Sequence, residues 1–445
     1  MAANRSILRD KRCERRSPLR ARSSGKETTP GMRFHAQWQF RKVLALAAWT
    51  VFSAAAQAPP PERAERQVVA PGVTYDHLRR TGPAGEPWSI HVIEVNRHEK
   101  SVCLKAVQGR ESEGAMQREL PTAMAARAAA RGEEVLAVVN GDYDLAVPHM
   151  GIPDGLSITS GRMWTTGKPN WPVLGITEKG EPIIDVPSVE IALEAGKSRW
   201  SITALNKPLG AVYGSGPRAF TSDFGPSVES AQPLSAVILL RLSPSPPLRA
   251  GKTARGRVDS VLSTGRVSLP NDLLAVVHPH SAAPAEGALS PTTLRPGQRV
   301  KLRVRVRLGK SEKVREAIGG FPILVRDGRV SLTGTPSEYL RRRHPRTAVC
   351  YNASKVIFVV VDGRQPQLSV GMTLEELAEL MVSLGCTVAM NTDGGGSSVM
   401  AVTSPVVSAQ PSRSGNAQTK LQIVNSPSDG AERGRGNAWV VVRKR

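Results

Sequence analysis

The chain has 445 residues, 40% of them apolar, which is enough to bury a substantial core and excludes a wholly disordered protein. Its formal net charge of +22 favours an anionic partner such as a nucleic acid, an acidic membrane or an anionic substrate. Residues 1–58 hold 12 of the 60 basic and 3 of the 38 acidic residues, so the remainder carries only +13, which does not predict nucleic-acid binding.

Residues 1–58 have the layout of a secretory signal region. Arg41 and Lys42 precede an apolar run, residues 43–56, that ends in small side chains. The run is shorter than the about 20 residues of a membrane-spanning helix, and no later segment is apolar enough to span. Met32 alone would begin a compact signal peptide, so residues 1–31 are interpreted as an upstream mis-assigned start, with a genuine basic arm as the alternative. We expect a secreted or periplasmic protein.

One domain is expected over residues 68–445, after a proline-rich linker at residues 59–67. Residues 122–131 are rich in alanine and predict a helix, and the apolar run 135–139 predicts a buried strand. That strand leads directly into Asn140-Gly141-Asp142-Tyr143. A turn at the end of a strand is a common place for a functional site.

Short strands separated by proline and glycine predict a β-rich insertion over residues 177–310. In residues 301–308 four cationic side chains alternate with apolar ones, so one face of this strand is basic. A polyanion-binding ridge and the solvated outer face of an antiparallel sheet both fit this pattern. The second interpretation is favoured.

The C-terminal third has the clearest periodicity. Residues 356–361 and 386–390 predict buried strands, and residues 373–384 predict an amphipathic helix that ends at Gly385. The fold class we expect is α+β or mixed α/β. In this fold a mixed sheet, shared by N-terminal and C-terminal strands, is flanked by helices, and the β-rich insertion forms a subdomain.

Three cysteines, Cys103, Cys350 and Cys386, lie outside the signal region. An exported protein meets an oxidising compartment, so one disulfide is possible, and Cys350 with Cys386 is the pair we favour. No two of these cysteines have the C-x-x-C spacing of a zinc site, so metal ligation by cysteine is not predicted.

The strongest chemical signal is the turn from Asn391 to Ser398. Its three consecutive glycines allow the backbone to approach a ligand closely, and their amide groups can converge on an anion. Asp393 adds a carboxylate beside these donors. The turn lacks the lysine of a P-loop, and a strand follows it rather than the helix of a dinucleotide-binding motif. A tight hairpin with incidental glycines is the alternative.

Arg346 and Glu376 are further candidates. Arg346 ends a cationic loop before a strand, and its planar guanidinium matches the oxygens of a phosphate. Glu376 stands three residues after Thr373, the spacing of a capping box that satisfies the free amides of a helix start. The same position also allows the carboxylate to act as an acid, a base or an orienting group in a pocket. Local sequence leaves both interpretations of Glu376 open.

Six motifs occur in one order along the chain. They are Gly319-Gly320-Phe321-Pro322-Ile323-Leu324, Pro345-Arg346-Thr347-Ala348, Val361-Asp362-Gly363-Arg364, Gly371-x-Thr373-Leu374-x-Glu376-Leu377-Ala378, Asn391-x-Asp393-Gly394-Gly395-Gly396-Ser397-Ser398 and Asn425-x-Pro427-Ser428-Asp429-Gly430-x-x-Arg433. Together they resemble the phosphodiester glycosidase domain family, over roughly residues 66–445 and most strongly after residue 316. The resemblance implies a hydrolase that cleaves the bond between a sugar's anomeric carbon and phosphate. Bacterial relatives are often described as exopolysaccharide-related.

The resemblance also implies a set of site residues. The catalytic candidates are Asp393, Glu376, Arg346 and Arg433, and the substrate-binding candidates are Asn140, Asp142, Asn391, Gly394, Gly395, Gly396 and Ser397. The family usually has a second glycine and an aromatic residue after the first Asn-Gly, where this chain has Asp142-Tyr143-Asp144. Asp142 is therefore expected to alter substrate choice or to bind a cation. No cofactor is expected, and a divalent cation near Asp142 or Asp393 is left open.

Two other functions fit parts of the sequence. A metal-dependent phosphodiesterase that breaks the P–O bond needs clustered His and Asp, whereas the C-terminal third has only His344. A non-catalytic binder of anionic exopolysaccharide would use the basic loop and the ridge around Arg303, but Asp393 and Glu376 would repel a polyanion. The favoured function is an exported phosphodiester glycosidase that acts on a sugar-phosphodiester or glycan, with no nucleic acid and no stable membrane span.

The signal region yields a direct test. We expect N-terminal sequencing of the exported protein to begin close to Gln57, because the small residues that precede it form the cleavage site. An intact Met1 on a protein retained in the cytoplasm would contradict this prediction.

Overall fold

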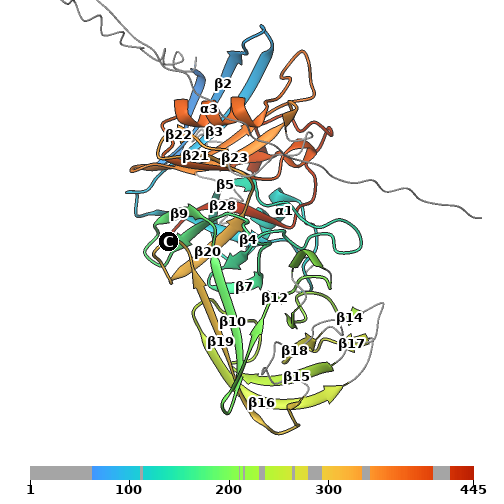
Figure 1. The fold of residues 1–445 in the computed structure, drawn as a ribbon. Helices are drawn as coiled ribbons and strands as arrows, with labels where there is room; N and C mark the ends of the chain where they lie inside the picture. The colour runs from blue at the N-terminus through green and yellow to red at the C-terminus, as the bar shows by residue number, and fades with distance from the viewer. Residues whose placement is uncertain are drawn as a thin grey trace, which may run out of the picture. The chain divides into compact units, whose positions relative to one another are not determined.

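The computed structural model describes residues 63–110, 114–209, 211–213, 216–229, 236–262, 266–278, 293–332, 341–403 and 421–444 (Figure 1). The predicted signal region, residues 1–58, lies outside the described residues. The first strand begins at Arg63, within the predicted linker. No helix among the described residues combines the length and the apolar character that crossing a membrane requires.

Sheet 1 has eight strands and combines N-terminal with C-terminal segments, as expected. In spatial order these strands are β1 (Arg63–Ala70), β2 (Val73–Thr81), β3 (Pro87–Asn96), β24 (Lys355–Val361), β23 (Arg346–Tyr351), β25 (Val388–Asn391), β21 (Ile323–Arg326) and β22 (Arg329–Val330).

Two five-stranded sheets lie next to each other in the fold. Sheet 2 consists of β27 (Leu421–Ile423), β26 (Met400–Thr403), β5 (Glu134–Asn140), β28 (Asn437–Arg443) and β4 (Val102–Gln108). Sheet 3 consists of β7 (Arg162–Thr165), β6 (Ser157–Thr159), β20 (Val314–Gly319), β8 (Val173–Thr177) and β9 (Pro182–Asp185). Strand β4 contacts both β6 and β20, which joins the two sheets.

Sheet 4 takes all of its strands from residues 188–307. Its strands are β11 (Ser198–Ile202), β10 (Ser188–Ala195), β19 (Arg299–Arg307), β16 (Thr253–Leu262), β15 (Ala236–Ser243), β18 (Leu273–His278), β13 (Arg218–Phe220) and β12 (Ala204–Leu205). A separate two-stranded sheet pairs β14 (Ser227–Glu229) with β17 (Arg266–Ser268), and Ala211–Tyr213 and Gly395–Ser397 form the short 3-10 helices η1 and η3.

Sheets 1 and 2 pack face to face, and alternation along the strands explains why. In β24, Phe358 and Val360 face sheet 2, where Phe358 meets Trp439 of β28 with ring centroids 6.4 Å apart. The intervening Ile357 and Val359 face the opposite side, where helix α3 (Leu374–Ser383) covers them with Leu377 and Met381. Helix α1 (Pro121–Ala130) covers the outer face of sheet 2 in the same way.

The expected mixed α/β fold with flanking helices is wrong, because the described residues form 28 strands and only two α-helices. Neighbouring strands are antiparallel apart from the pair β12 and β13. Antiparallel neighbours are joined by short turns and do not need the crossover helices of a parallel sheet. Both predicted helices, at 122–131 and 373–384, are present, but no further α-helix flanks the sheets among the described residues.

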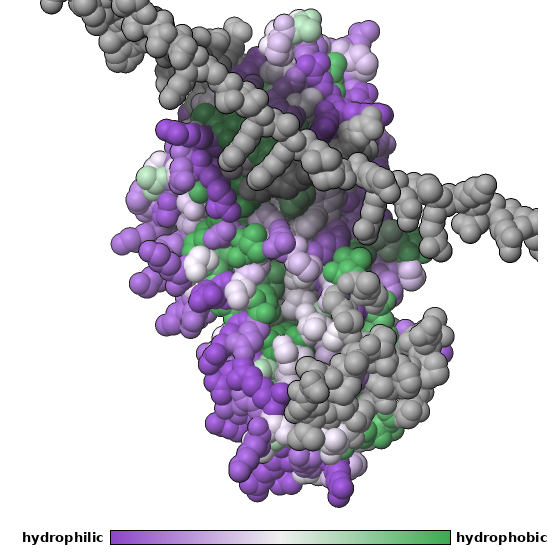
Figure 2. All heavy atoms as spheres, in the orientation of Figure 1, coloured by the Kyte–Doolittle hydropathy of each residue, from purple (hydrophilic) through white to green (hydrophobic). Residues whose placement is uncertain are grey.

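The basic strand of the predicted insertion is β19, and two of its cationic side chains lie opposite glutamates of the neighbouring strand β10. Lys301 pairs with Glu194 and Arg305 with Glu190 across the β10–β19 register, with ion-pair distances of 3.4 and 3.6 Å. Figure 2 shows hydrophilic side chains, at the lower left, over the area of β10 and β19. This arrangement supports the interpretation as a solvated outer sheet face, which was favoured.

The predicted disulfide is present between Cys350 and Cys386, with Cα atoms 5.8 Å apart. It ties β23 to the segment that follows α3, and both cysteines are buried. Cys103, on β4, is the free cysteine of the described part of the chain. The bridge therefore fixes α3 against the middle of sheet 1.

Removal of this disulfide is expected to destabilise the fold. Cross-linking two cysteines 36 residues apart restricts the unfolded chain, and loop-closure entropy predicts a gain of about 3 to 4 kcal/mol. The double variant Cys350→Ala/Cys386→Ala should lower the free energy of unfolding by about this amount in urea denaturation, whereas Cys103→Ala should change it little. Equal stability of the double variant and the Cys103→Ala control would contradict the prediction.

Candidate active site

The predicted glycine turn connects the two facing sheets. It leaves sheet 1 at the end of β25 and enters sheet 2 at β26. Backbone hydrogen bonds hold it on both sides, since the Thr392 amide donates to the Thr347 carbonyl at 2.9 Å and the Asp393 amide donates to the Gly141 carbonyl at 3.1 Å. The turn after β5, the start of β23 and the glycine turn therefore meet at one place.

Asn140 holds the glycine turn in position. Its Nδ2 donates to the Asp393 carbonyl at 2.7 Å, and its Oδ1 accepts from the Thr347 hydroxyl at 2.9 Å and from the Val399 amide at 3.0 Å. The side chain is buried. Asn140 was predicted to bind substrate, and the structure places it beneath the turn, where protein groups use both ends of its amide.

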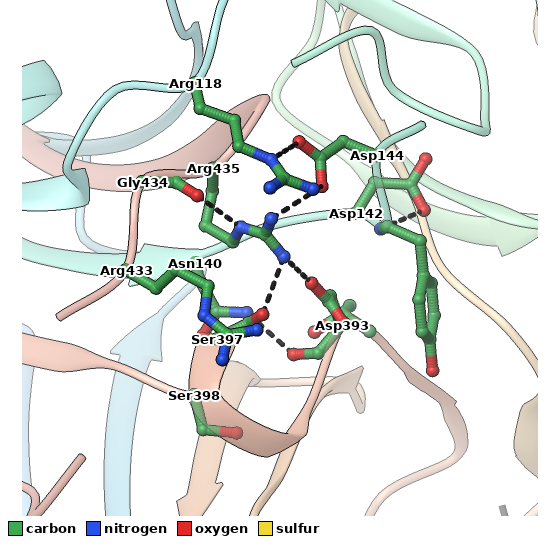
Figure 3. Close-up of polar contacts among 12 residues, drawn as sticks. Arg118, Asn140, Asp142, Asp144, Asp393, Ser397, Ser398, Arg433, Gly434 and Arg435 are labelled. Carbon is green, nitrogen blue, oxygen red and sulfur yellow. Dashed lines mark hydrogen bonds and ion pairs between the residues drawn. The ribbon is translucent and has the colours of Figure 1, made fainter. Parts of the chain in front are cut away.

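A buried arginine, Arg435, joins two carboxylates (Figure 3). Its guanidinium forms an ion pair with Asp393, and it donates to Asp144 Oδ1 and to the Ser397 hydroxyl, both at 2.6 Å. Asp144 is also bound by Arg118, with Nε at 2.5 Å and Nη2 at 3.1 Å. We call these residues, Arg118, Asp144, Arg435 and Asp393, the Arg435 network.

Opposing effects act on the pKa of the Asp393 carboxyl. Burial raises its pKa, whereas the charge of Arg435 and a hydrogen bond with Ser397 lower it, and the net pKa lies above the ordinary value. The nearby charge of Asp144 also raises it. A carboxyl group held in this way beside a turn is typical of a site where chemistry depends on its charge.

The backbone amides of the three glycines in the turn differ in their hydrogen bonding. The Gly395 amide donates to the Pro345 carbonyl at 2.8 Å, so the fold itself uses this group. The Gly394 and Gly396 amides have no acceptor among the described residues. Gly395 also has a φ of +65°, a conformation that favours glycine. Two of the three predicted backbone donors therefore remain available to an anion.

Two exposed arginines lie over this turn. Arg433 forms an ion pair with Asp429, and its Nη2 is 2.5 Å from where a Cβ on Gly396 would be. Arg364 has a φ of +60°, and its Nη2 is 3.0 Å from the corresponding position on Gly395. Both arginines are exposed, so each can meet a ligand at the turn.

Arg346 lies next to the glycine turn, with its Cα 3.6 Å from where a Cβ on Gly394 would be. It is buried, and it donates from Nε to the Met372 carbonyl at 2.8 Å and from Nη2 to the Arg342 carbonyl at 2.7 Å. These bonds use it within the fold, whereas the sequence predicted a phosphate contact. That contact stays a prediction.

The buried Asp142 carboxylate holds three neighbouring N–H groups. Its carboxylate accepts from the Gly155 amide at 2.6 Å, from the Tyr143 amide at 2.9 Å and from the Trp171 indole at 3.1 Å. Burial, followed by the charge of Asp154, raises the pKa of Asp142 to about 7. With three N–H donors already on its oxygens, this carboxylate is a poor candidate for the cation that the sequence left open.

Asn391, at the end of β25, is buried and faces an aromatic residue. Its Nδ2 donates at 2.8 Å to the Tyr143 hydroxyl and to the carbonyls of Phe321 and Thr392. Asn391 therefore links the glycine turn to the turn after β5 and to the segment after β20.

Glu376 forms the capping box that was one of its two interpretations. Its carboxylate accepts from the Thr373 amide at 2.9 Å, and its own amide donates to the Thr373 hydroxyl at 3.1 Å. Arg343 donates to the same carboxylate from Nε at 3.0 Å. Burial raises the pKa of Glu376, but the hydrogen bonds from Arg343 and Thr373 outweigh it and hold the pKa below its ordinary value.

Sequence reasoning missed Arg118, Asp144, Arg364 and Arg435. Arg433 and Arg435 alternate with glycine in Arg433-Gly434-Arg435-Gly436, and this pattern does not show which arginine is buried. Arg364 stands in one of the six motifs, yet its place beside Gly395 depends on the turn that Asp362 holds through Ser89 and His91, both at 2.9 Å. No local signal marks Arg118 or Asp144.

Glu376→Gln separates capping from chemistry. Gln keeps the capping geometry, so we expect this variant to fold and to retain activity close to that of the wild-type protein. Thr373→Ala removes the hydroxyl cap and should lower the free energy of unfolding by about 1 kcal/mol. Steady-state kinetics and urea denaturation measure the two effects. A loss of about 10²-fold or more in kcat for Glu376→Gln would instead assign its carboxylate to the reaction.

Part of the chain is similar to a known protein family. Residues 253–442 match the family model described as phosphodiester glycosidase, a range that includes the glycine turn, Arg364 and Arg435. Comparison with curated protein sequences finds no match.

Several solved structures have a similar fold. A hypothetical protein from Synechocystis superposes with a TM-score of 0.65 and 17% identity, over 87% of this chain and 65% of the Synechocystis chain. A protein from Burkholderia pseudomallei, assumed to be exported, has a TM-score of 0.57 and 19% identity, over 80% of this chain and 74% of its own.

A third similar structure is the zebrafish N-acetylglucosamine-1-phosphodiester α-N-acetylglucosaminidase catalytic domain, auto-inhibited by its pro-peptide. It has a TM-score of 0.42 and 16% identity, over 86% of this chain and 87% of its own. The first two structures show a shared fold. The match of the family model confirms the resemblance seen in the sequence motifs: residues 253–442 of this chain are similar to the phosphodiester glycosidase family.

Proposed function

We propose that this protein is an exported hydrolase that cleaves a sugar-1-phosphodiester between the anomeric carbon and the phosphate. The observation that carries the proposal is the position of the buried Asp393 carboxylate at a turn where the Gly394 and Gly396 amides have no acceptor among the described residues. Such amides bind an anion, and a carboxylate beside them can act on the carbon to which that anion is attached.

The leaving group decides which contacts matter. A phosphate monoester leaves more easily than an alcohol, so the reaction needs stabilisation of negative charge more than a strong acid. The two free amides and the exposed Arg364 and Arg433 supply that stabilisation. Asp393 faces the anomeric carbon and stabilises its developing positive charge.

The Arg435 network keeps Asp393 in place, and the charge of Arg435 favours the ionised form of its carboxyl. Arg435 is buried against both Asp393 and Asp144, so a change at any member leaves a charge without its partner. In this assignment Asp393 is the reacting carboxylate. Arg346 supports the site through its hydrogen bond to the Met372 carbonyl, and Glu376 supports it by capping helix α3.

We further propose that the reaction needs no bound metal ion, because Arg435 already pairs with Asp393 and would repel a divalent cation. Export is supported by the basic, apolar and small residues of the N-terminal region and by the similar fold of the Burkholderia protein. A secreted or periplasmic enzyme would meet phosphodiester-linked glycans of the cell envelope.

A product assay tests the proposal. Purified protein is incubated with a panel of hexopyranose-1-phosphodiesters, with and without EDTA, and free sugar and sugar-1-phosphate are separated. We expect free sugar and a phosphomonoester, unaffected by EDTA. Sugar-1-phosphate as the product would favour a phosphodiesterase, and binding of anionic polysaccharide without turnover would favour a non-catalytic binder.

Asp393→Asn is expected to lower kcat by about 10²-fold or more while the protein remains folded, because Asn keeps the shape but not the charge. The wild-type rate should fall as the pH is lowered, since only the ionised carboxylate is active. Because the pKa of Asp393 is raised, this fall should begin at a higher pH than for an ordinary aspartate. The exposed Asp259→Asn, on sheet 4, is the control. Full activity of Asp393→Asn would overturn the site assignment.

A further inference from the structure

Three aromatic rings gather next to the Asp393 turn. Tyr143 follows β5, Trp171 precedes β8 and Phe321 follows β20. Trp171 and Phe321 stack with centroids 5.0 Å apart and planes 17° apart, and Tyr143 meets Trp171 edge-on at 5.8 Å. All three residues are partly exposed, so this aromatic wall has a surface that a ligand can reach.

Hydrogen bonds join the aromatic wall to the segment that leads into Asp393. Asn391, two residues before Asp393, donates to the Tyr143 hydroxyl and to the Phe321 carbonyl, both at 2.8 Å. Burial, followed by the charge of Asp393, raises the pKa of the Tyr143 hydroxyl, and the charge of Arg346 lowers it. The Tyr143 hydroxyl therefore lies within the electrostatic field of the site.

The rings are also held rigidly. The Trp171 indole donates to the buried Asp142 carboxylate at 3.1 Å, and the Tyr143 amide donates to the same carboxylate at 2.9 Å. The buried Asp142 carboxylate thus holds the Trp171 ring and the backbone of Tyr143. Rigid aromatic surfaces bind with little loss of side-chain freedom, and their apolar faces suit the C–H faces of a pyranose ring.

The contacts to the aromatic wall and the anion-binding groups flank Asp393 along the chain. Along the chain, Asn391 and its aromatic contacts precede Asp393, whereas Gly394 and Gly396 follow it. In the view of Figure 3, Asp142 and Arg433 lie on opposite sides of Asp393. A phosphodiester with its phosphate at the glycine turn would therefore extend its sugar toward the wall and place its anomeric carbon beside Asp393.

We propose that Tyr143, Trp171 and Phe321 form the sugar subsite, which binds a hexopyranose ring by stacking, with Asp142 as the residue that positions Trp171. This inference rests on the proposed function for the placement of the phosphate. It assigns Asp142 a role in substrate recognition through Trp171 rather than through a cation.

Equilibrium binding tests the subsite without any turnover. Isothermal titration calorimetry measures the Kd of the methyl α-hexopyranosides of glucose, galactose, mannose and N-acetylglucosamine, with glycerol 1-phosphate as the anion probe. We expect at least one methyl glycoside to bind the wild-type protein. Trp171→Ala and Phe321→Leu should each weaken that sugar by about tenfold or more, the scale of a lost aromatic contact, and leave glycerol 1-phosphate unchanged.

The control is Phe224→Leu, because Phe224 is also partly buried but packs against Phe220 and His149 instead. Circular dichroism checks that each variant is folded. Phe321→Leu keeps an apolar side chain, so its sugar binding decides the outcome if Trp171→Ala is unfolded. Absence of methyl glycoside binding to the wild-type protein, or binding to Phe321→Leu as tight as to the control, would overturn the subsite. Sugar binding without hydrolysis of any phosphodiester would support the subsite and contradict the proposed function instead.

Discussion

Arg435 is buried between Asp144 and Asp393, and this pairing sets the geometry of the whole site. Burial of one guanidinium and two carboxylates is costly unless each charge meets its partners at hydrogen-bonding distance. Arg118 adds a second cation to Asp144, so the network joins four segments far apart in the sequence. The pairing therefore exists only when sheet 2, the turn after β5 and the glycine turn are all in place.

The sheets make this arrangement rigid. Asp393 lies in the glycine turn, which connects the two packed sheets. The Asn140 side chain holds this turn, because it donates to the Asp393 carbonyl and accepts from the Val399 amide. Because Gly394 and Gly396 belong to the same turn as Asp393, the carboxylate and the anion donors keep a fixed relation. A site of this kind requires little reorganisation when charge develops in a reaction.

Local patterns in the sequence predicted local structure well. The capped helix α3, the alanine-rich helix α1, the Cys350–Cys386 bridge and the glycine turn were all visible, because each depends on residues close in sequence or on chemistry specific to one residue type. The fold class was predicted wrongly. Strands of two to ten residues gave weak periodicity, and the pairing that makes the sheets antiparallel depends on distant partners.

The same distinction applies to the site. Asp393 was found because glycines surround it, whereas Arg435 was missed because its identity as the buried arginine depends on Asp144, almost three hundred residues earlier in the chain. Asp142 was noticed as unusual, but only the fold shows that it holds Trp171 and the Gly155 amide.

We propose above all that bond cleavage occurs at the anomeric carbon beside Asp393. Hydrolysis of a sugar-1-phosphodiester in water enriched in oxygen-18, followed by mass spectrometry of both products, tests it most directly, because cleavage on either side of the bridging oxygen can release the same two molecules. We predict that the label enters the anomeric hydroxyl of the sugar and that the phosphomonoester stays unlabelled. Label in the phosphomonoester, with an unlabelled sugar, would show P–O cleavage and contradict the account.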